Sequence, residues 1–215
     1  MQVSEDHLAI IERAVTGDRR GTEDAWRTAS WSRCLRNYKL DPSRPELIQL
    51  EDATIRHERD FFGQDLNIAR QELEKTLAMI EGGGYSAQIT NANGVIIDER
   101  ASRDQTYYCS MDCVGSVWTE EVGGTNGIGT AIITEQVTPV YLADHFYAGM
   151  TGQACVGAPF FGPPGGLLGV INLSTRNPSL PKLVHRVVSG IAQVAAERLE
   201  QQYFRRHFGK FHTLH

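Results

Sequence analysis

Apolar residues recur at the spacing of an amphipathic helix in three stretches near the amino terminus of the chain. These stretches cover about residues 5–15, 22–37 and 45–80. Gly17 stops the first, Pro42 ends the second, and a break near Gly63 divides the third. Pro45 suits the first turn of the third helix, so the pattern predicts a helical region that precedes the core of the protein.

The pattern changes after Gly84 to short β-like runs that are separated by turn residues. The runs lie at residues 85–90, 95–97, 137–142, 154–161 and 167–173. The segment Asn91-Ala-Asn-Gly94 favours a hairpin turn between the first two runs, and Pro163-Pro-Gly-Gly166 favours a turn between the last two. The sequence therefore predicts an α+β fold with a central antiparallel sheet of five to six strands and flanking helices.

A final helix is predicted from Pro181 onward. Its apolar stripe is wider than a coiled-coil seam and contains Val184, Val187, Val188, Ile191, Val194, Ala195 and Leu199. Such a stripe indicates core packing, and we also expect it to pair with the helix near residues 66–77, within one subunit or across a homodimer. We divide the chain into a helical region (1–64), a core domain (65–180, with strands from about residue 84) and a C-terminal signalling or dimerisation helix (181–215).

Composition and charge narrow the class of protein. The 215 residues are 41% hydrophobic and 22% charged, which is ordinary for a soluble globular protein. We find neither a membrane-spanning apolar run nor a signal-peptide pattern, and we therefore expect a cytoplasmic protein that does not bind a membrane. The net charge of -5 argues against direct binding of nucleic acid, and a basic cluster near Arg205 is typical of a solvated helix face.

Four glycines fall within seven residues of the segment Trp118-Thr-Glu-Glu-Val-Gly-Gly-Thr-Asn-Gly-Ile-Gly-Thr130. They predict a tight turn, and Thr125 or Asn126 can cap a short helix that begins there. The backbone N–H groups of such a turn suit an anion or a carbonyl group. The segment matches neither the dinucleotide fingerprint nor a P-loop, and a purely structural turn is the alternative interpretation.

Six motifs occur in a fixed order along most of the chain. They are Ser30-Trp-Ser-Arg-Cys34, Tyr38-Lys-Leu-Asp-Pro42, the 118–130 segment, Asp144-His-Phe146, Cys155-x-x-Ala-Pro159 and Gly165-Gly-Leu-Leu-Gly169. In combination they resemble the amino-terminal sensor region of AcoR-type, sigma-54-dependent (Fis-family) transcriptional activators, over roughly residues 27–206. Two departures from the family pattern stand out: Asp144 replaces the usual glutamate, and the variable loop here reads Tyr107-Tyr-Cys-Ser-Met-Asp-Cys113.

The resemblance implies a GAF domain at residues 65–180, in which helices cover one side of the sheet and loops roof a small-molecule pocket on the other. It also implies partners within a longer protein, namely an AAA+ ATPase module and a helix-turn-helix DNA-binding domain. This sequence contains neither, and we expect it to be the sensor region of such a protein. The favoured function is therefore regulatory and not enzymatic: a small-molecule effector binds the pocket and shifts the flanking helices.

The residues expected at the effector pocket combine aromatic walls with polar groups: Tyr107, Tyr108, Trp118, Thr125, Asn126 and His145. His145 could donate a hydrogen bond to the effector, or it could cap a helix or satisfy backbone groups. The aromatic side chains could wall the pocket or fill the core.

The cysteines leave further alternatives open. Cys109 and Cys113 are four residues apart and, with Asp112 and a distant His145 or Cys155, could bind a metal ion as cofactor. The same pair could instead form a reversible redox-sensing disulfide, or it could pack under a loop. A thiol-based methionine sulfoxide reductase on a GAF frame is a weaker alternative, because no motif in the sequence supports catalysis.

Overall fold

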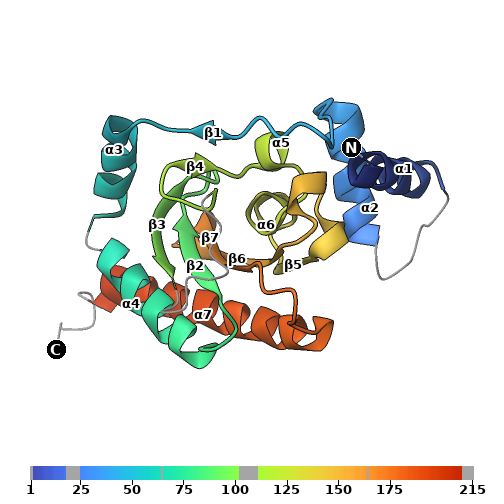
Figure 1. The fold of residues 1–215 in the computed structure, drawn as a ribbon. Helices are drawn as coiled ribbons and strands as arrows, with labels where there is room; N and C mark the ends of the chain where they lie inside the picture. The colour runs from blue at the N-terminus through green and yellow to red at the C-terminus, as the bar shows by residue number, and fades with distance from the viewer. Residues whose placement is uncertain (1, 18–24, 64, 102–110, 164, 210–215) are drawn as a thin grey trace.

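The computed structural model describes residues 2–17, 25–63, 65–101, 111–163 and 165–209. Its centre is a five-stranded antiparallel sheet with the strand order β3-β2-β7-β6-β5 (Figure 1). The strands are β2 (Ser86–Thr90), β3 (Ile96–Ala101), β5 (Thr138–Tyr141), β6 (Ala154–Gly162) and β7 (Gly166–Thr175). The predicted α+β class and the five antiparallel strands are confirmed. The strand ends lie within two residues of the prediction, except that β3, predicted at residues 95–97, continues to Ala101.

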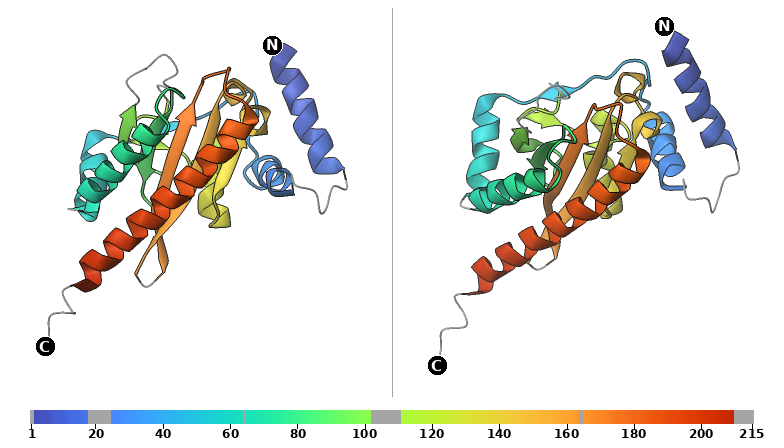
Figure 2. Two further views of the ribbon diagram at one scale, coloured as in Figure 1. Left: turned by 90° about the horizontal axis from the view of Figure 1, so that it is seen from below. Right: turned by 60° about the horizontal axis from the view of Figure 1, so that its bottom comes forward.

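Helices surround the sheet on both faces (Figures 1 and 2). Those before the sheet are α1 (Gln2–Thr16), α2 (Ala25–Ser32), the π-helical turn η1 (Arg33–Asn37), α3 (Asp52–Phe62) and α4 (Asp65–Met79). Between the strands lie α5 (Glu120–Gly123), α6 (Gly127–Thr134) and the 3-10 turns η3 (Leu142–Asp144) and η4 (Ala148–Met150). Helix α7 (Lys182–Phe208) follows the last strand. Figure 1 shows α4 and α7 on one side of the sheet and α6 on the other.

The main hydrophobic core lies between the sheet and the pair α4 and α7. Because side chains alternate along a strand, every second residue of the central strands faces these helices. The strand residues in this core are Ala87, Ile89, Ile97, Val156, Ala158, Phe160, Ile171 and Leu173. They meet Leu66, Ala69 and Leu73 of α4 and Val188, Ala192, Ala195 and Leu199 of α7. The expected pairing of the last helix with residues 66–77 is thus present within one chain.

The stripe predicted on α7 divides into two faces. Val188, Ala195 and Leu199 are buried in the core, whereas Val187 and Val194 are 59% and 43% exposed. The wide stripe therefore comprises a core face and a second, solvent-facing row. Figure 2 shows that the carboxy-terminal end of α7 continues past the strands of the sheet.

The prediction of a helix beginning at Pro45 was wrong. Residues 48–49 form the short strand β1 (Ile48–Gln49), which pairs with β4 (Ser116–Val117). The side chain of Gln49 holds this pair together by donating to Val114 O (2.7 Å) and accepting from Ser116 Oγ (2.9 Å). A strand whose partner lies almost 70 residues away has no local periodic signal, so the helical spacing before Asp52 was misleading. The break predicted near Gly63 does separate α3 from α4.

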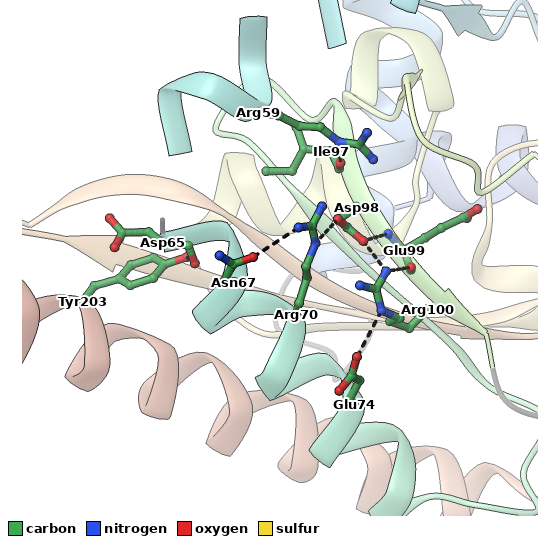
Figure 3. Close-up of polar contacts among 10 residues, drawn as sticks. All are labelled: Arg59, Asp65, Asn67, Arg70, Glu74, Ile97, Asp98, Glu99, Arg100 and Tyr203. Atoms are coloured by element: carbon green, nitrogen blue, oxygen red, sulfur yellow. Dashed lines mark hydrogen bonds and ion pairs between the residues drawn. The ribbon is translucent and has the colours of Figure 1, made fainter. Parts of the chain in front are cut away.

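A group of charged residues fastens the helices to the edge strand β3 (Figure 3). Asp98 of β3 accepts from Arg70 Nε of α4 at 2.6 Å and from Arg100 NH1 at 2.5 Å. Arg59 Nε of α3 donates to the backbone carbonyl of Ile97 at 2.7 Å, and Tyr203 OH of α7 donates to Asp65 O at 3.1 Å. These contacts fix both α3 and α4 relative to β3, and α4 relative to α7.

Candidate functional site

Polar side chains occupy the sheet face that lies opposite α4 and α7. Directly paired residues of adjacent strands share a face, and the pairs Ser86–Ser174 and Gln88–Asn172 join β2 to β7 on this side. Each of these four side chains is at most 4% exposed. A buried sheet face lined with amides and hydroxyls is unusual, because each polar group must find a partner away from water.

These side chains form one continuous hydrogen-bonded chain. Asn172 Nδ2 donates to Gln88 Oε1 (2.8 Å), and Gln88 Nε2 donates to Ser86 Oγ (2.8 Å). Ser86 Oγ lies 3.1 Å from Ser174 Oγ, which donates to Asp112 Oδ2 at 2.6 Å. Gln153 Nε2 donates to the same Asp112 oxygen at 2.9 Å. The chain therefore runs across β2 and β7 to the two loop residues Asp112 and Gln153.

At each end of this polar chain, one side-chain amide oxygen has no hydrogen-bond donor among the described residues. Asn172 Oδ1 and Gln153 Oε1 are buried and have no hydrogen-bond partner among the residues that the structure describes. A buried acceptor without a donor costs about 1–3 kcal/mol. Such groups are rare in native proteins and often mark the place of a missing ligand or water. The two oxygens therefore identify this sheet face as the candidate site.

Asp112 supplies the titratable group of the polar chain. Its side chain is buried against the sheet, and burial raises the pKa of its carboxyl group to about 6, although the hydrogen bonds from Ser174 and Gln153 and the positive charge of Arg176 oppose this rise. The carboxyl group thus titrates near neutral pH.

The glycine-rich segment positions α6 over this face. Asn126, one of the two caps that the sequence allowed, is the N-cap of α6, and its side chain accepts from Gly129 N at 2.8 Å. The start of the helix packs directly on β6, since a Cβ at Gly157 would lie 1.9 Å from Gly127 O. Asn126 Nδ2 donates to the carbonyls of Trp118 and Gly124, so its hydrogen-bonding groups serve the turn itself.

A buried ion pair ties this segment to the helices near the amino terminus. Glu120 is 1% exposed and receives two hydrogen bonds from Arg33, at 2.6 and 2.8 Å. Ser30 Oγ and Thr130 Oγ1 also donate to Glu120 Oε1, at 2.5 and 3.0 Å. Thr125 lies behind Ser30, with the two hydroxyl oxygens 2.6 Å apart. The predicted site residue Thr125 is therefore buried, and its hydroxyl group is hydrogen-bonded to Ser30.

His145 and Cys155 lie side by side beneath the start of α6. His145 Nε2 is 3.1 Å from Cys155 Sγ, and Gly127 N–H donates to the same sulfur at 3.2 Å. Both side chains are buried. His145 Nδ1 lies 3.0 Å from Leu142 O, which can only accept, so Nδ1 carries the proton. Burial lowers the pKa of His145 to about 4, although the hydrogen bond to Leu142 O opposes this shift.

The backbone around His145 is held by the helices near the amino terminus. His7 Nε2 of α1 lies 2.9 Å from His145 O, and Trp31 Nε1 of α2 donates to Asp144 O at 3.0 Å. Arg27 of α2 forms an ion pair with the Asp144 carboxylate. The segment 144–146 thus joins Cys155 on one side to α1 and α2 on the other.

The remaining predicted residues are placed as follows. Tyr107, Tyr108 and Cys109 lie outside the described residues. Trp118 is 3% exposed, and its Nε1 has no hydrogen-bond partner among the described residues. Cys113 is half-buried at the β1–β4 pair, where its sulfur contacts Gln49 and Ser116.

The structure does not bring Cys113 and Cys155 to a common set of contacts. Among the described residues, no group of three or more His, Cys, Asp or Glu side chains is arranged to hold a metal ion. The metal and disulfide hypotheses both depend on Cys109, so they stay predictions.

Sequence reasoning missed the polar chain of Gln88, Asn172, Ser174 and Gln153, and it considered Asp112 only as a metal ligand. The segments Ser86-Ala-Gln-Ile-Thr90 and Ile171-Asn-Leu-Ser174 alternate apolar and polar residues. That alternation is the ordinary signal of a strand with one solvated face. Only the burial of both faces distinguishes this sheet from that common case.

A five-stranded antiparallel sheet with two helices on one face, and with a short helix and loops over a buried polar face on the other, defines a GAF-like fold. The family model described as "MimR, N-terminal domain" matches residues 24–198, and the chain belongs to that family. The resemblance to AcoR-type activators that the six motifs indicated is thereby confirmed.

Two curated relatives show the same relationship. The chain is 31% identical over 196 residues to the acetoin catabolism regulatory protein of Cupriavidus necator, covering 90% of this chain and 29% of the relative. It is 30% identical over 152 residues to the propane 2-monooxygenase operon transcriptional activator MimR of Mycolicibacterium smegmatis, covering 68% of this chain and 25% of the relative. The chain thus spans less than a third of these relatives, whose names indicate a regulatory role.

A solved structure supports the fold. The crystal structure of the E. coli DhaR(N)–DhaL complex matches with a TM-score of 0.71 at 18% identity, over 86% of this chain and 65% of that chain. Within the described residues, none of the helices combines the length and the apolar character that crossing a bilayer requires.

Proposed function

We propose that this chain is the effector-sensing domain of a sigma-54-dependent transcriptional activator, and that its effector binds against the polar sheet face. The observation that carries the proposal is the buried polar chain that ends in two unpaired amide oxygens, Asn172 Oδ1 and Gln153 Oε1. A ligand that donates a hydrogen bond to each of them would remove the cost of burying them unpaired.

The same groups favour a class of effector. Asn172 Oδ1 and Gln153 Oε1 are acceptors, and the Asp112 carboxyl group lies between them in the chain. A carboxylate or phosphate ligand would bring further lone pairs and negative charge to this site, which is unfavourable away from water. A small uncharged molecule with hydroxyl groups suits the site better. The name of the acetoin catabolism regulatory protein agrees with this class, since acetoin is a small hydroxyketone.

The effector would act on the flanking helices through the contacts already described. The segment 144–146 joins Cys155 to α1 and α2, and the group around Asp98 joins β3 to α3 and α4. Helices α1, α2 and α7 would then carry the change to an AAA+ module and a DNA-binding domain in the same full-length protein. The size of this effect is limited by how much better the effector binds one arrangement of the helices than the other.

Isothermal calorimetry tests the proposal with a panel of acetoin, 2,3-butanediol and lactate. We expect the two uncharged compounds to bind and lactate, which keeps a hydroxyl group but carries a carboxylate, to bind at least about tenfold more weakly. Asn172→Ala should weaken the binding of the uncharged compounds by about tenfold through loss of the acceptor. Asn177→Ala is the matched control, because Asn177 caps a surface turn by accepting from Ser179 N.

Failure of every uncharged compound to bind, or equal effects of the two asparagine variants, would contradict this assignment. Preferential binding of lactate would instead place an anion at the site and overturn the proposed class of effector.

A homodimer through α7 is the second part of the proposal. The exposed apolar residues Leu183, Val187, Val194 and Phe204 follow each other along α7 at spacings that are sums of three and four residues. That row is typical of a helix that packs on another helix. Near its end, Phe204 and Phe208 line a groove of about 490 Å³ with Phe161 of the β6–β7 hairpin. We assign this groove to subunit pairing and not to the effector, because it is separated from the polar sheet face by the sheet itself.

A further inference from the structure

The thiol of Cys155 has polar neighbours from three different elements. His145 Nε2 is 3.1 Å from the sulfur, and Gly127 N–H donates to it at 3.2 Å from the first turn of α6. Asn172 Oδ1 of β7 and Cys155 Sγ both border the Cα of Gly127. A Cβ atom added to Gly127 would lie 2.8 Å from Asn172 Oδ1 and 3.2 Å from Cys155 Sγ. A cysteine that only fills space in a core does not need such neighbours.

The contacts of the His145 imidazole show which atom carries the proton between Cys155 Sγ and His145 Nε2. Because Nδ1 of His145 donates to Leu142 O, its Nε2 has no proton in the neutral ring and accepts from the Cys155 S–H group. The His145 pKa of about 4 keeps the ring neutral at pH 7. His145 is thus oriented and protonated as a general base for the thiol requires.

Two further groups suit the product of an addition to a carbonyl compound. The Gly127 N–H group, in the first turn of the eight-residue helix α6, stabilises negative charge on the sulfur while the proton leaves. Asn172 Oδ1 is an acceptor with no partner among the described residues, and it lies where a new hydroxyl group beside the sulfur could donate to it. Thiol, base and hydroxyl acceptor are therefore together.

We propose that Cys155 captures the carbonyl carbon of an aldehyde or ketone effector as a reversible thiohemiacetal, with His145 as the proton carrier. The sulfur attacks the carbonyl carbon and forms the S–C bond while the S–H proton passes to His145 Nε2. The C=O π bond opens toward oxygen, which takes the proton from His145 and becomes a hydroxyl that donates to Asn172 Oδ1. The addition needs no oxidant or reductant and reverses by the same path. This inference rests on the proposed function, because it assigns a chemistry to the same site.

The test uses 2,3-butanedione labelled with ¹³C at its carbonyl carbons, in borate-free buffer, with 2,3-butanediol as the reduced match that cannot be attacked. We expect the ¹³C spectrum of the wild-type protein to show a tetrahedral-carbon signal that is absent from butanedione and its hydrate in buffer alone and that is lost in Cys155→Ser. Cys34→Ser is the matched control, because Cys34 is also buried but contacts the Thr125 hydroxyl in place of a histidine. A signal that survives in Cys155→Ser would come from addition elsewhere and would overturn the proposal.

Calorimetry separates this inference from the proposed function. Cys155→Ser should weaken the binding of butanedione by about tenfold or more and leave the binding of butanediol within about twofold. If the variant binds both compounds as the wild type does, capture is overturned while the effector site stands. If the wild-type protein shows no tetrahedral-carbon signal beyond that of butanedione in buffer, capture is overturned as well. The binding of acetoin, 2,3-butanediol and lactate then tests the proposed function by itself.

A third variant tests the role of His145 as proton carrier. His145→Gln retains a polar side chain of similar reach but cannot take up the thiol proton, so formation of the adduct should slow by about a hundredfold. Circular dichroism would show that the variants are folded. An unchanged rate in His145→Gln would remove His145 from the reaction.

Discussion

Arg33 and Glu120 form a bidentate ion pair, and the side chain of Glu120 is 0% exposed. This pair joins the π-helical turn after α2 to the glycine-rich segment. Two hydroxyl groups complete the contacts of the carboxylate. The pair holds α5 and α6 against the helices near the amino terminus, so the position of Gly127 above Cys155 depends on it.

Loss of the arginine should therefore be costly. Arg33→Met leaves the Glu120 carboxylate buried without its cation, and we expect the free energy of unfolding to fall by about 3–5 kcal/mol in urea denaturation. Arg36→Met on the same turn is the control, because Arg36 is exposed and donates to Val15 O at 3.3 Å. It should change stability by less than about 1 kcal/mol. Equal effects of the two variants would show that the ion pair is not what holds this segment.

Asp98 offers a second stability test, at the edge of the sheet. Asp98→Asn removes the charge that Arg70 and Arg100 share, and we expect a loss of about 1–3 kcal/mol together with faster amide hydrogen exchange in α4. Glu74→Gln is a matched control, because Glu74 also pairs with Arg100 but is largely exposed. That change should cost less than about 1 kcal/mol. Faster exchange in α4 for Glu74→Gln but not for Asp98→Asn would contradict the assignment.

The buried carboxyl group of Asp112 predicts a dependence of stability on pH. Its folded-state pKa of about 6 lies above the ordinary value of 3.8, so the folded protein favours the protonated form. The contribution of this group is therefore most favourable below pH 3.8 and is lost as the pH rises to about 6. Relative to the wild type, Asp112→Asn should gain up to about 3 kcal/mol of unfolding free energy between pH 4 and pH 7.5.

The buried histidines act in the opposite direction. Burial lowers the pKa of His145 and of His185 to about 4, so their contributions are lost as the pH falls below 6.5. Comparing each variant with the wild type at every pH cancels this effect. Asp60→Asn on the exposed surface of α3 should show no such gain, and a flat difference for Asp112→Asn would contradict the prediction.

The homodimer is tested on the exposed row of α7. Val187→Asp places a charge in the apolar row, and we expect the dimer to dissociate with a Kd raised by about a hundredfold, measured by light scattering during gel filtration. Arg186→Asp changes the neighbouring exposed position outside that row and should leave the dimer intact. A wild-type protein that is monomeric at high concentration, or a dimer that tolerates Val187→Asp, would remove α7 as the interface.

The sequence by itself determined much of the architecture. Strands β2, β3, β5, β6 and β7, the long helix α7 and the N-cap at Asn126 all follow from local signals, namely alternation, helical periodicity and turn chemistry. The family also followed from the sequence, because six motifs in order are specific in combination. The proposed boundaries 1–64, 65–180 and 181–215 stay predictions.

The tertiary structure decided what local signals cannot carry. The pairing of β1 with β4 and the two faces of α7 depend on partners that are distant in the sequence. The polar chain from Asn172 to Gln153 became visible only when both sheet faces proved to be buried. Cys155 and His145 are ten residues apart, and nothing in that spacing predicts their contact. Periodicity reports which face of an element is apolar, whereas packing decides which polar groups are sealed from water together.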